Sequence, residues 1–479
     1  MFRWISQAYK YIRLIYSIHN YINHYNRTQE HDIDAINNII TKVKDGGAVV
    51  IKFVQWSIPK LEAMSAVTEK PPWLIRLESL YEDCNHHSME YTIKCYNEIY
   101  NKDFNSDYEI IDVIGSGSIG QVYLIQNKPL TKFSIREKYV MKVRHPGVKR
   151  DIDFFSTFYT LSKYIPGCQR LLKQNFPFDI YNFIEQFREQ IDFINESNNL
   201  LRFKECYKDN DYIIIPELIN CSPSIMIMKY EEGVSFDDMD IDSYQKYKIA
   251  VLLSSFTKNN MQILNFHHGD LHKGNWKIKI EKDNHHRLII YDFGFCWSVP
   301  EYKIGVIDKL RAIFEHTDSD TEIIDLDSMT TVFTYFIKYD KDNADNIKRS
   351  VLNHLEENIN EIKPWRLDPS RLFKMACDIC ISKDLLIDPI LIQAVIILIQ
   401  CEKIFSKFNL IGTDKDELTS RVLFRSKYLD LIALYDTYDI FREFNDYLKE
   451  ILNEKQMKLG DIFDSVEMPE SIKNLALLK

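Results

Sequence analysis

Glycine is scarce in this chain, and its positions constrain the fold more than any other feature. Only 14 of the 479 residues are glycine, fewer than the roughly 7% of an average protein. Six of them fall in three short motifs: Gly115, Gly117 and Gly120, then Gly269 and Gly274, then Gly294.

The first motif reads Val-Ile-Gly-Ser-Gly-Ser-Ile-Gly-Gln-Val-Tyr over residues 113–123. A GxGxxG pattern also fits a dinucleotide-binding fold, but there the glycine loop opens a helix. Here the strand-like run Gln121–Ile125 follows, so the pattern predicts a strand, a loop and a second strand. In that arrangement backbone N–H groups close over nucleotide phosphates, as in protein kinases, and any side chain would hold the backbone away.

Between the first and second glycine motifs lies a predicted strand, Tyr139–Val143, which contains one lysine, Lys142, in an apolar run. A lysine in a strand is more often a residue at a sheet edge than a ligand. Burying it without an anionic partner is costly. The α- and β-phosphates of a nucleotide, together with Glu196 from a later helix, would supply that partner.

Two further motifs carry oxygen ligands. Asp270 and Asn275 are five residues apart in His-His-Gly-Asp-Leu-His-Lys-Gly-Asn, the spacing of the catalytic base and the metal ligand in a kinase catalytic loop. Asp292 ends an apolar strand and begins Asp-Phe-Gly. Carboxylate and amide oxygens suit Mg²⁺ bridged to phosphates, so the expected metal ligands are Asn275 and Asp292.

The order of these motifs predicts an α+β, bilobal protein-kinase-like fold. A helical extension covers residues 1–105, a small β-rich N-lobe with a helical insertion covers 106–232, and a large helical C-lobe covers 233–479. Backbone at the junction of the lobes is expected to bind adenine, at Met228, Lys229 and Tyr230. The strands expected around the motifs are Tyr108–Ile114, Gln121–Ile125, Tyr139–Val143, Tyr212–Ile215, Ser224–Met228 and Leu288–Tyr291.

Several of these stretches resemble one family closely. Ser-Ile-Gly-Gln-Val after residue 117, Lys142-Val-Arg-His-Pro-Gly-Val, Asp192-x₃-Glu196-x₂-Asn199-x₂-Arg-Phe and His-x-Asp270-x-His-x-Gly-Asn are similar to motifs of the UbiB/ADCK (aarF-domain-containing) atypical kinases. The resemblance covers about residues 40–300. It implies binding of ATP or ADP with Mg²⁺, and a role in lipid or quinone metabolism as an ATPase or lipid-linked kinase.

The resemblance also implies regulatory residues. The family carries a KxGQ helix that folds over the active site, and this chain has Lys52 and Gln55 there with Val54 in place of glycine. The family's ExD element corresponds to Gln190 and Asp192, so its glutamate is missing unless Glu189 substitutes for it. The expected regulatory set is therefore Lys52, Gln55 and Asp192.

Composition limits the partners and the compartment. The formal net charge of −10 argues against a nucleic-acid partner. Nine scattered cysteines favour a reducing, intracellular compartment. Cys377 and Cys380 form a CxxC in an apolar stretch and are expected to pack in the core, since zinc normally needs four ligands. No run reaches the ~18 apolar residues of a membrane span; Ile390–Ile399 is expected to be a buried helix.

Residues 1–29 lack acidic side chains and carry four basic ones. At helical spacing Ile5, Tyr9, Ile12 and Tyr16 share an apolar face. Such a helix can lie on an anionic membrane, can target a protein to an organelle such as a mitochondrion, or can pack on the rest of the protein. All three alternatives stay open from the sequence.

The leading hypothesis is Mg²⁺-dependent ATP hydrolysis or phosphoryl transfer near a membrane lipid, with Asp270, Lys142 and Glu196 as catalytic residues. A nucleotide-binding pseudokinase scaffold is the alternative. A serine/threonine protein kinase is disfavoured, because Phe295–Glu301 follows Asp292 with little room for an activation loop. The sequence indicates no oligomeric state.

Overall fold

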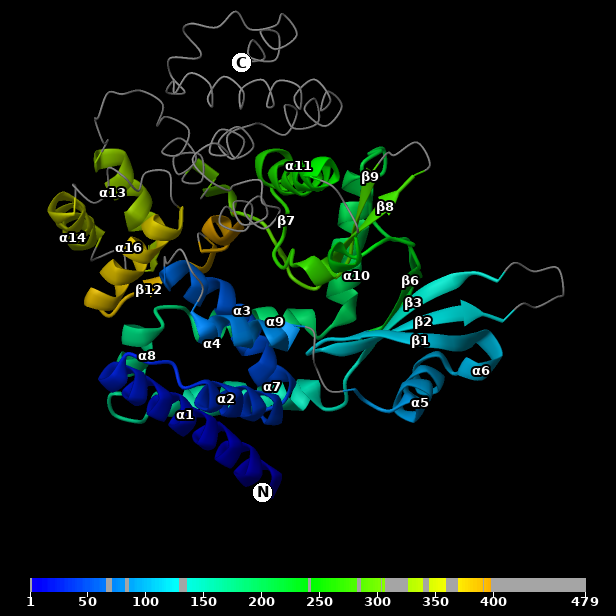
Figure 1. Cartoon of the computed structure of the whole chain (residues 1–479), viewed down its shortest axis with the longest axis horizontal. Coiled ribbons are helices and arrows are strands. Elements are labelled where there is room, and N and C mark those ends of the chain that lie inside the picture. Colours follow the sequence, from blue (N-terminus) through cyan, green and yellow to red (C-terminus); the bar gives the residue numbers. More distant parts are fainter. Residues whose placement is uncertain are drawn as a thin grey trace, which may run out of the picture. The chain divides into compact units, whose positions relative to one another are not determined.

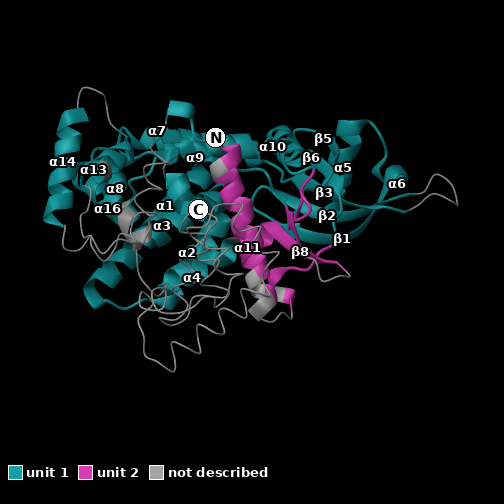
Figure 2. Ribbon diagram, turned by 90° about the horizontal axis from the view of Figure 1, so that it is seen from above, with its two compact units in different colours: residues 1–208, 215–231, 291–399 teal, residues 209–214, 232–290, 400–479 magenta. Residues whose placement is uncertain are grey.

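The computed structural model describes residues 2–65, 71–81, 86–128, 136–239, 243–281, 286–302, 304–305, 326–338, 344–358, 369–390 and 392–397. The chain divides into two compact units (Figure 2). Unit 1 comprises Met1–Lys208, Ile215–Glu231 and Tyr291–Ile399, and unit 2 comprises Asp209–Ile214, Glu232–Ile290 and Gln400–Lys479. Residues 398–479, assigned by the sequence to a C-lobe, lie outside the described residues.

The N-terminal part of unit 1 is helical, as the sequence predicts. Asp32 and Ser88 accept backbone N–H groups at the starts of the second and fifth helices, the ordinary role of such residues at an N-cap. The elements are α1 (Phe2–Thr28), α2 (Ile33–Asp45), α3 (Ala48–Ser65), α4 (Pro72–Leu77), η1 (Glu78–Tyr81), α5 (Met89–Tyr100) and α6 (Phe104–Asp107).

A five-stranded antiparallel sheet follows, in the order β1-β2-β3-β6-β5 (Figure 1). One face carries Tyr123, Met141 and Val143, which form a core with Tyr96 of α5 and Phe104 of α6. Side chains alternate along a strand, so Lys142 points to the opposite face. The strands are β1 (Tyr108–Ser116), β2 (Gly120–Asn127), β3 (Lys138–Arg144), β5 (Leu218–Cys221) and β6 (Ile225–Lys229). The sequence had not predicted β5.

Four helices lie between β3 and β5. Residues 180–206 form two helices, because Asp192 caps a new helix and accepts the N–H of Ile194. An apolar cluster that includes Val49, Ile152 and Phe183 joins α3 to two of these helices, α7 and α9. The helices are α7 (Val148–Ser162), α8 (Cys168–Asn175), α9 (Ile180–Gln190) and α10 (Phe193–Cys206).

The remainder of unit 1 is mostly helical. Cys377 and Cys380 are fully buried, as their predicted core packing requires, and burial raises the pKa of Cys380 to about 12. Residues 392–397 of the expected buried helix are helical. The elements are β10 (Cys296–Trp297), α13 (Leu326–Tyr335), β11 (Ile337–Lys338), α14 (Ala344–Glu357), α16 (Pro369–Ser382) and β12 (Leu386–Ile387).

Unit 2 contains a three-stranded sheet in the order β4-β9-β8. From residue 233 onward the sequence predicted a predominantly helical lobe with one strand at Leu288–Tyr291. This was wrong for Trp276–Ile280, which forms β8, with Trp276 and Ile278 buried and the two lysines of the strand partly exposed. The elements are β4 (Ile213–Ile214), η2 (Phe236–Asp238), α11 (Ser243–Asn259), η3 (Asn260–Leu264), β7 (His267–His268), η4 (Lys273–Asn275), β8 (Trp276–Ile280) and β9 (His286–Ile290).

Helix α1 packs on unit 1, but not through the apolar face formed by Ile5, Tyr9, Ile12 and Tyr16. Tyr11 and Leu14 are buried in a cluster with residues of α2, α3 and α7. The predicted face is left exposed, with Ile5, Tyr9, Ile12 and Tyr16 each about 60% exposed. Packing therefore occurs, and it leaves an apolar face uncovered by the described residues. No helix in the described part of the chain has the length and apolarity to cross a bilayer.

Candidate active site

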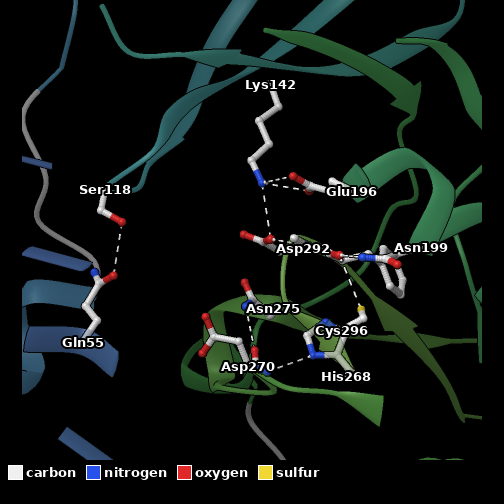
Figure 3. A network of polar contacts seen from close by, with 12 residues as sticks. Gln55, Ser118, Lys142, Glu196, Asn199, His268, Asp270, Asn275, Asp292 and Cys296 are labelled. Atoms are coloured by element: carbon white, nitrogen blue, oxygen red, sulfur yellow. Dashed lines mark hydrogen bonds and ion pairs between the residues drawn. The ribbon is translucent and has the colours of Figure 1, made fainter. Parts of the chain in front are cut away.

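Lys142 of β3 makes the central contacts of the site in unit 1 (Figure 3). Its Nζ donates to both carboxylate oxygens of Glu196, at 2.8 Å each. The same Nζ lies 3.3 Å from Oδ1 of Asp292. Lys142 is 9% exposed and Glu196 1% exposed, so the buried ammonium is matched by a buried carboxylate. Three residues from three separate motifs are thus brought together, as the sequence predicted.

Burial and charge act in opposite directions on this cluster. Burial lowers the pKa of Lys142, but the carboxylates of Asp292 and Glu196 outweigh it, and the net pKa is raised above the usual lysine value. Burial raises the pKa of Glu196 to about 7, although Lys142 acts to lower it. Lysine therefore stays charged, and Glu196 holds its charge only through its partner.

Asp292 is fixed by the residues that follow it. Its φ of +55° is a left-handed conformation that is uncommon for a residue other than glycine. The N–H of Gly294 donates to Asp292 Oδ1 at 3.2 Å. Phe293 is buried against Phe203 of α10, with ring centroids 5.2 Å apart. These contacts orient the Asp-Phe-Gly turn.

Asn199 is a supporting residue to which the sequence gave no role. Its Nδ2 donates to the carbonyl oxygen of Phe293 at 2.9 Å, so helix α10 holds both Lys142 and the Asp-Phe-Gly turn. The signal was present: Asn199 follows Glu196 by three residues, which places the two side chains on one helix face.

The glycine loop between β1 and β2 is closed by one hydrogen bond, from the N–H of Gly117 to the carbonyl of Gly120. A Cβ added at Gly120 would lie 2.7 Å from the carbonyl oxygen of Val143, so the sheet itself requires glycine there. Among the described residues, a Cβ at Gly115 would meet no atom within 4 Å, and one at Gly117 would meet none closer than 3.8 Å. These two glycines border open space.

The predicted regulatory helix is α3, and Gln55 reaches the glycine loop. Gln55 is buried; it donates to the carbonyl of Leu80 at 2.7 Å and accepts from Ser118 Oγ at 3.2 Å. Lys52 is close enough to lower the pKa of Glu196. Val54, in place of the family glycine, packs against the cluster of α1, α2 and α7.

The two residues that correspond to the family's ExD element, Gln190 and Asp192, have structural roles. Asp192 caps α10, the helix that carries Glu196. Gln190 is buried at the end of α9. Regulation by Lys52, Gln55 and Asp192 stays a prediction.

Unit 2 brings Asp270 and Asn275 together. The amide nitrogen of Asn275 donates to the carbonyl oxygen of Asp270 at 2.8 Å, and the N–H of Asp270 donates to His268 Nδ1 at 3.3 Å. His272 caps the short turn η4 by accepting the N–H of Gly274. Because the amide nitrogen of Asn275 is used internally, its oxygen is the atom that would face a cation.

At the strand end predicted to bind adenine, two of the backbone N–H groups already donate to other residues of the protein. Met228 is buried in β6. The N–H groups of Lys229 and Tyr230 donate to the carbonyls of Glu217 and Lys138. An adenine contact in this segment would have to use other backbone groups, and the role of these three residues stays a prediction.

The residues present fit a magnesium nucleotide better than a metal held by protein alone. Among the described residues, no cluster of three or more His, Cys, Asp or Glu side chains could hold a metal ion. Mg²⁺ in phosphate-transfer sites uses one or two protein oxygens and takes the rest from phosphates and water. Open space beside Gly115 and Gly117 suits phosphates.

A lysine on the third strand of an antiparallel sheet, paired with a helix glutamate below a glycine loop, defines a kinase-like domain. Residues 79–324, just over half of the chain, match the ABC1 atypical kinase-like domain. The chain therefore belongs to this family, which confirms the predicted kinase-like fold and the resemblance to UbiB/ADCK proteins.

Named relatives are similar over part of their length. A Dictyostelium discoideum protein named probable serine/threonine-protein kinase abkC is 27% identical over 52% of this chain and 36% of its own length. The Arabidopsis thaliana protein ACTIVITY OF BC1 COMPLEX KINASE 8, chloroplastic, is 27% identical over 44% of this chain and 27% of its own length. The matched part thus spans about a third of these relatives.

Among solved structures, the erythromycin complex of Rv3197 from Mycobacterium tuberculosis is similar at 17% sequence identity. The match covers 68% of this chain and 86% of the Rv3197 chain, with a TM-score of 0.39.

Proposed function

We propose that this protein binds ATP or ADP with Mg²⁺ and acts as an atypical kinase or ATPase in lipid- or quinone-related metabolism. The observation that carries the proposal is the contact of Lys142 Nζ with Glu196 at 2.8 Å and with Asp292 at 3.3 Å. A buried lysine held between two carboxylates, beside a glycine loop that borders open space, is prepared for phosphate oxygens.

The chain's own residues divide the work. Lys142, oriented by Glu196, binds nucleotide phosphates, and the backbone at Gly115 and Gly117 lies over them. Asn275 of unit 2 and Asp292 of unit 1 are the residues that would hold Mg²⁺, which would neutralise charge on the phosphates. Asp270 orients the nucleophile and accepts its proton.

Helix α1 supports a membrane location for this activity. Its exposed face combines isoleucines, tyrosines and Trp4, and no acidic residue occurs before Glu30. Arg13 lies 5.6 Å from the ring centroid of Tyr9. Apolar side chains flanked by cations are what an interfacial helix presents to anionic lipids.

Phosphate release in the presence and absence of anionic liposomes tests the proposal. The wild-type protein with Mg-ATP is compared with Asp270→Asn, and the melting temperature of each confirms folding. We expect the variant to lose about 100-fold or more in rate, and the wild-type rate to rise with liposomes. Equal, near-zero rates in both proteins would make the chain a nucleotide-binding scaffold. Robust phosphorylation of added peptides would indicate a protein kinase.

A further inference from the structure

A chain of hydrogen bonds that does not involve α3 also reaches the glycine loop. His145, which follows β3, is within 3.0 Å of the carbonyl oxygen of Gly117 through its Nε2. Its Nδ1 lies 2.7 Å from Nδ1 of His87, a residue just before α5. The Nε2 of His87 is 2.8 Å from Thr92 Oγ1, which is 2.6 Å from the hydroxyl of Tyr123.

The direction of these bonds follows from the one group that can only accept. Because the Gly117 carbonyl has no proton, Nε2 of His145 must carry one. In a neutral His145 the Nδ1 is then an acceptor, so Nδ1 of His87 donates to it. The Nε2 of a neutral His87 accepts in turn from the hydroxyl of Thr92, and every ring nitrogen of the pair is used.

A single added proton would not break this chain. With His145 charged, the bond between the imidazoles reverses, His87 donates to Thr92, and the bond to Gly117 persists. Only if both histidines were charged would the Nδ1–H of one ring face the Nδ1–H of the other. Burial lowers the pKa of both rings, that of His87 to about 4, so the pair stays uncharged near neutral pH. His86 acts electrostatically on both rings, and the rings of Tyr91 and Tyr123 lie against His87.

The backbone of His145 adds a second bond to the loop. Its N–H donates to the carbonyl of Ile119 at 2.9 Å. Gln121, the first residue after the loop glycines, is buried and accepts the backbone N–H of His87. On the other side Ser118 donates to Gln55 of α3. All the residues of this network belong to unit 1, and residues 117–119 at the tip of the loop are each bonded to His145 or Gln55.

We propose that His145, oriented by His87, is a positioning residue that holds the glycine loop in the conformation that accepts nucleotide phosphates. The proposal rests on the proposed nucleotide function. This role requires no contact between either histidine and the nucleotide. Their effect is to remove conformational freedom from the loop before binding, which lowers the entropy cost of ordering it.

The test compares His145→Ala with His145→Gln. Glutamine keeps a donor for the Gly117 carbonyl and an acceptor for His87, whereas alanine keeps neither. His86→Ala removes an exposed histidine next to the network and serves as the matched control. Two quantities are measured: hydrogen exchange of amides 115–122 in the ligand-free protein, and the dissociation constant of Mg-ATP. Melting temperatures confirm that each variant is folded.

We expect His145→Ala to exchange loop amides faster and to bind Mg-ATP about three- to tenfold more weakly, the range of one lost hydrogen bond. His145→Gln and His86→Ala should stay close to wild type in both. Unchanged exchange in His145→Ala, or a glutamine variant as impaired as the alanine variant, would overturn the proposal. A wild-type protein that binds no Mg-ATP would refute the nucleotide function instead, and loop exchange would still decide whether His145 anchors the loop.

Discussion

The ammonium group of Lys142 contacts both Glu196 and Asp292. Replacing this lysine should therefore change the free energy of unfolding by an amount that depends on pH. The pKa of Glu196 is raised from the ordinary glutamate value of 4.5 to about 7. Between these two pH values the folded protein therefore binds more protons than the unfolded chain. Stability therefore falls as pH rises through this window. Lys142→Met removes a cause that lowers this pKa, so the loss should extend to higher pH.

We expect the free energy of unfolding of Lys142→Met, relative to wild type, to be lower at about pH 8.5 than at about pH 6, by roughly 1–3 kcal/mol. Urea denaturation at both pH values measures it. Lys94→Met, which removes an exposed lysine, is the control and should show no such difference. A penalty for Lys142→Met that is the same at both pH values would show that Glu196 is not the group left uncompensated.

The loop glycines should separate a structural requirement from a functional one. Gly120→Ala would place a methyl group against the backbone of β3, and we expect it to destabilise the protein by about 1–3 kcal/mol. Gly117→Ala would approach no described atom closer than the carbonyl oxygen of Gly120 at 3.8 Å, so it should leave the melting temperature nearly unchanged and weaken Mg-ATP binding. Thermal denaturation and nucleotide titration of both variants provide the measurements. The reverse pattern would contradict the assignment of the open space to phosphates.

At the scale of elements, helix α1 has two apolar sides, one buried and one exposed. Tyr11 and Leu14 pack on unit 1, while Ile5 and Ile12 remain exposed. The double variant Ile5→Asp/Ile12→Asp should leave folding intact and reduce binding to anionic liposomes by more than about tenfold, since each isoleucine contributes roughly 1–3 kcal/mol when buried.

Liposome co-sedimentation, with circular dichroism for folding, measures this. Ile75→Asp on α4 is a matched control, because Ile75 is a helical isoleucine with 53% exposure, similar to Ile12. Equal binding by the double variant and wild type would remove α1 from the membrane account.

For the whole molecule, local patterns were readable from the sequence and long-range contacts were not. The glycine loop, the strand of Lys142 and the Asp-Phe-Gly turn each depend on a few adjacent residues, so their positions could be predicted. The pairing of Lys142 with Glu196 was predicted because a buried ammonium needs an anion. The contact of Gln55 with Ser118 spans 63 residues and that of His87 with His145 spans 58, and no local pattern marks either.

The packing of α1 and the strand β8 were not readable from the sequence for related reasons. The sequence left the packing of α1 open, because the cluster of α2, α3 and α7 selects Tyr11 and Leu14, and this choice depends on tertiary packing. In β8 the alternation of apolar residues with lysine was visible, yet five residues amid helical patterns gave too short a signal.

The central claim is that Lys142, Glu196 and Asp292 form a site for a magnesium nucleotide. Titration calorimetry of Mg-ATP into the wild-type protein and into Asp292→Asn tests it most directly, because the amide keeps the shape of the carboxylate and removes its charge. The account predicts saturable binding by wild type and a loss of about 100-fold or more in the variant. Undiminished binding by Asp292→Asn would contradict it.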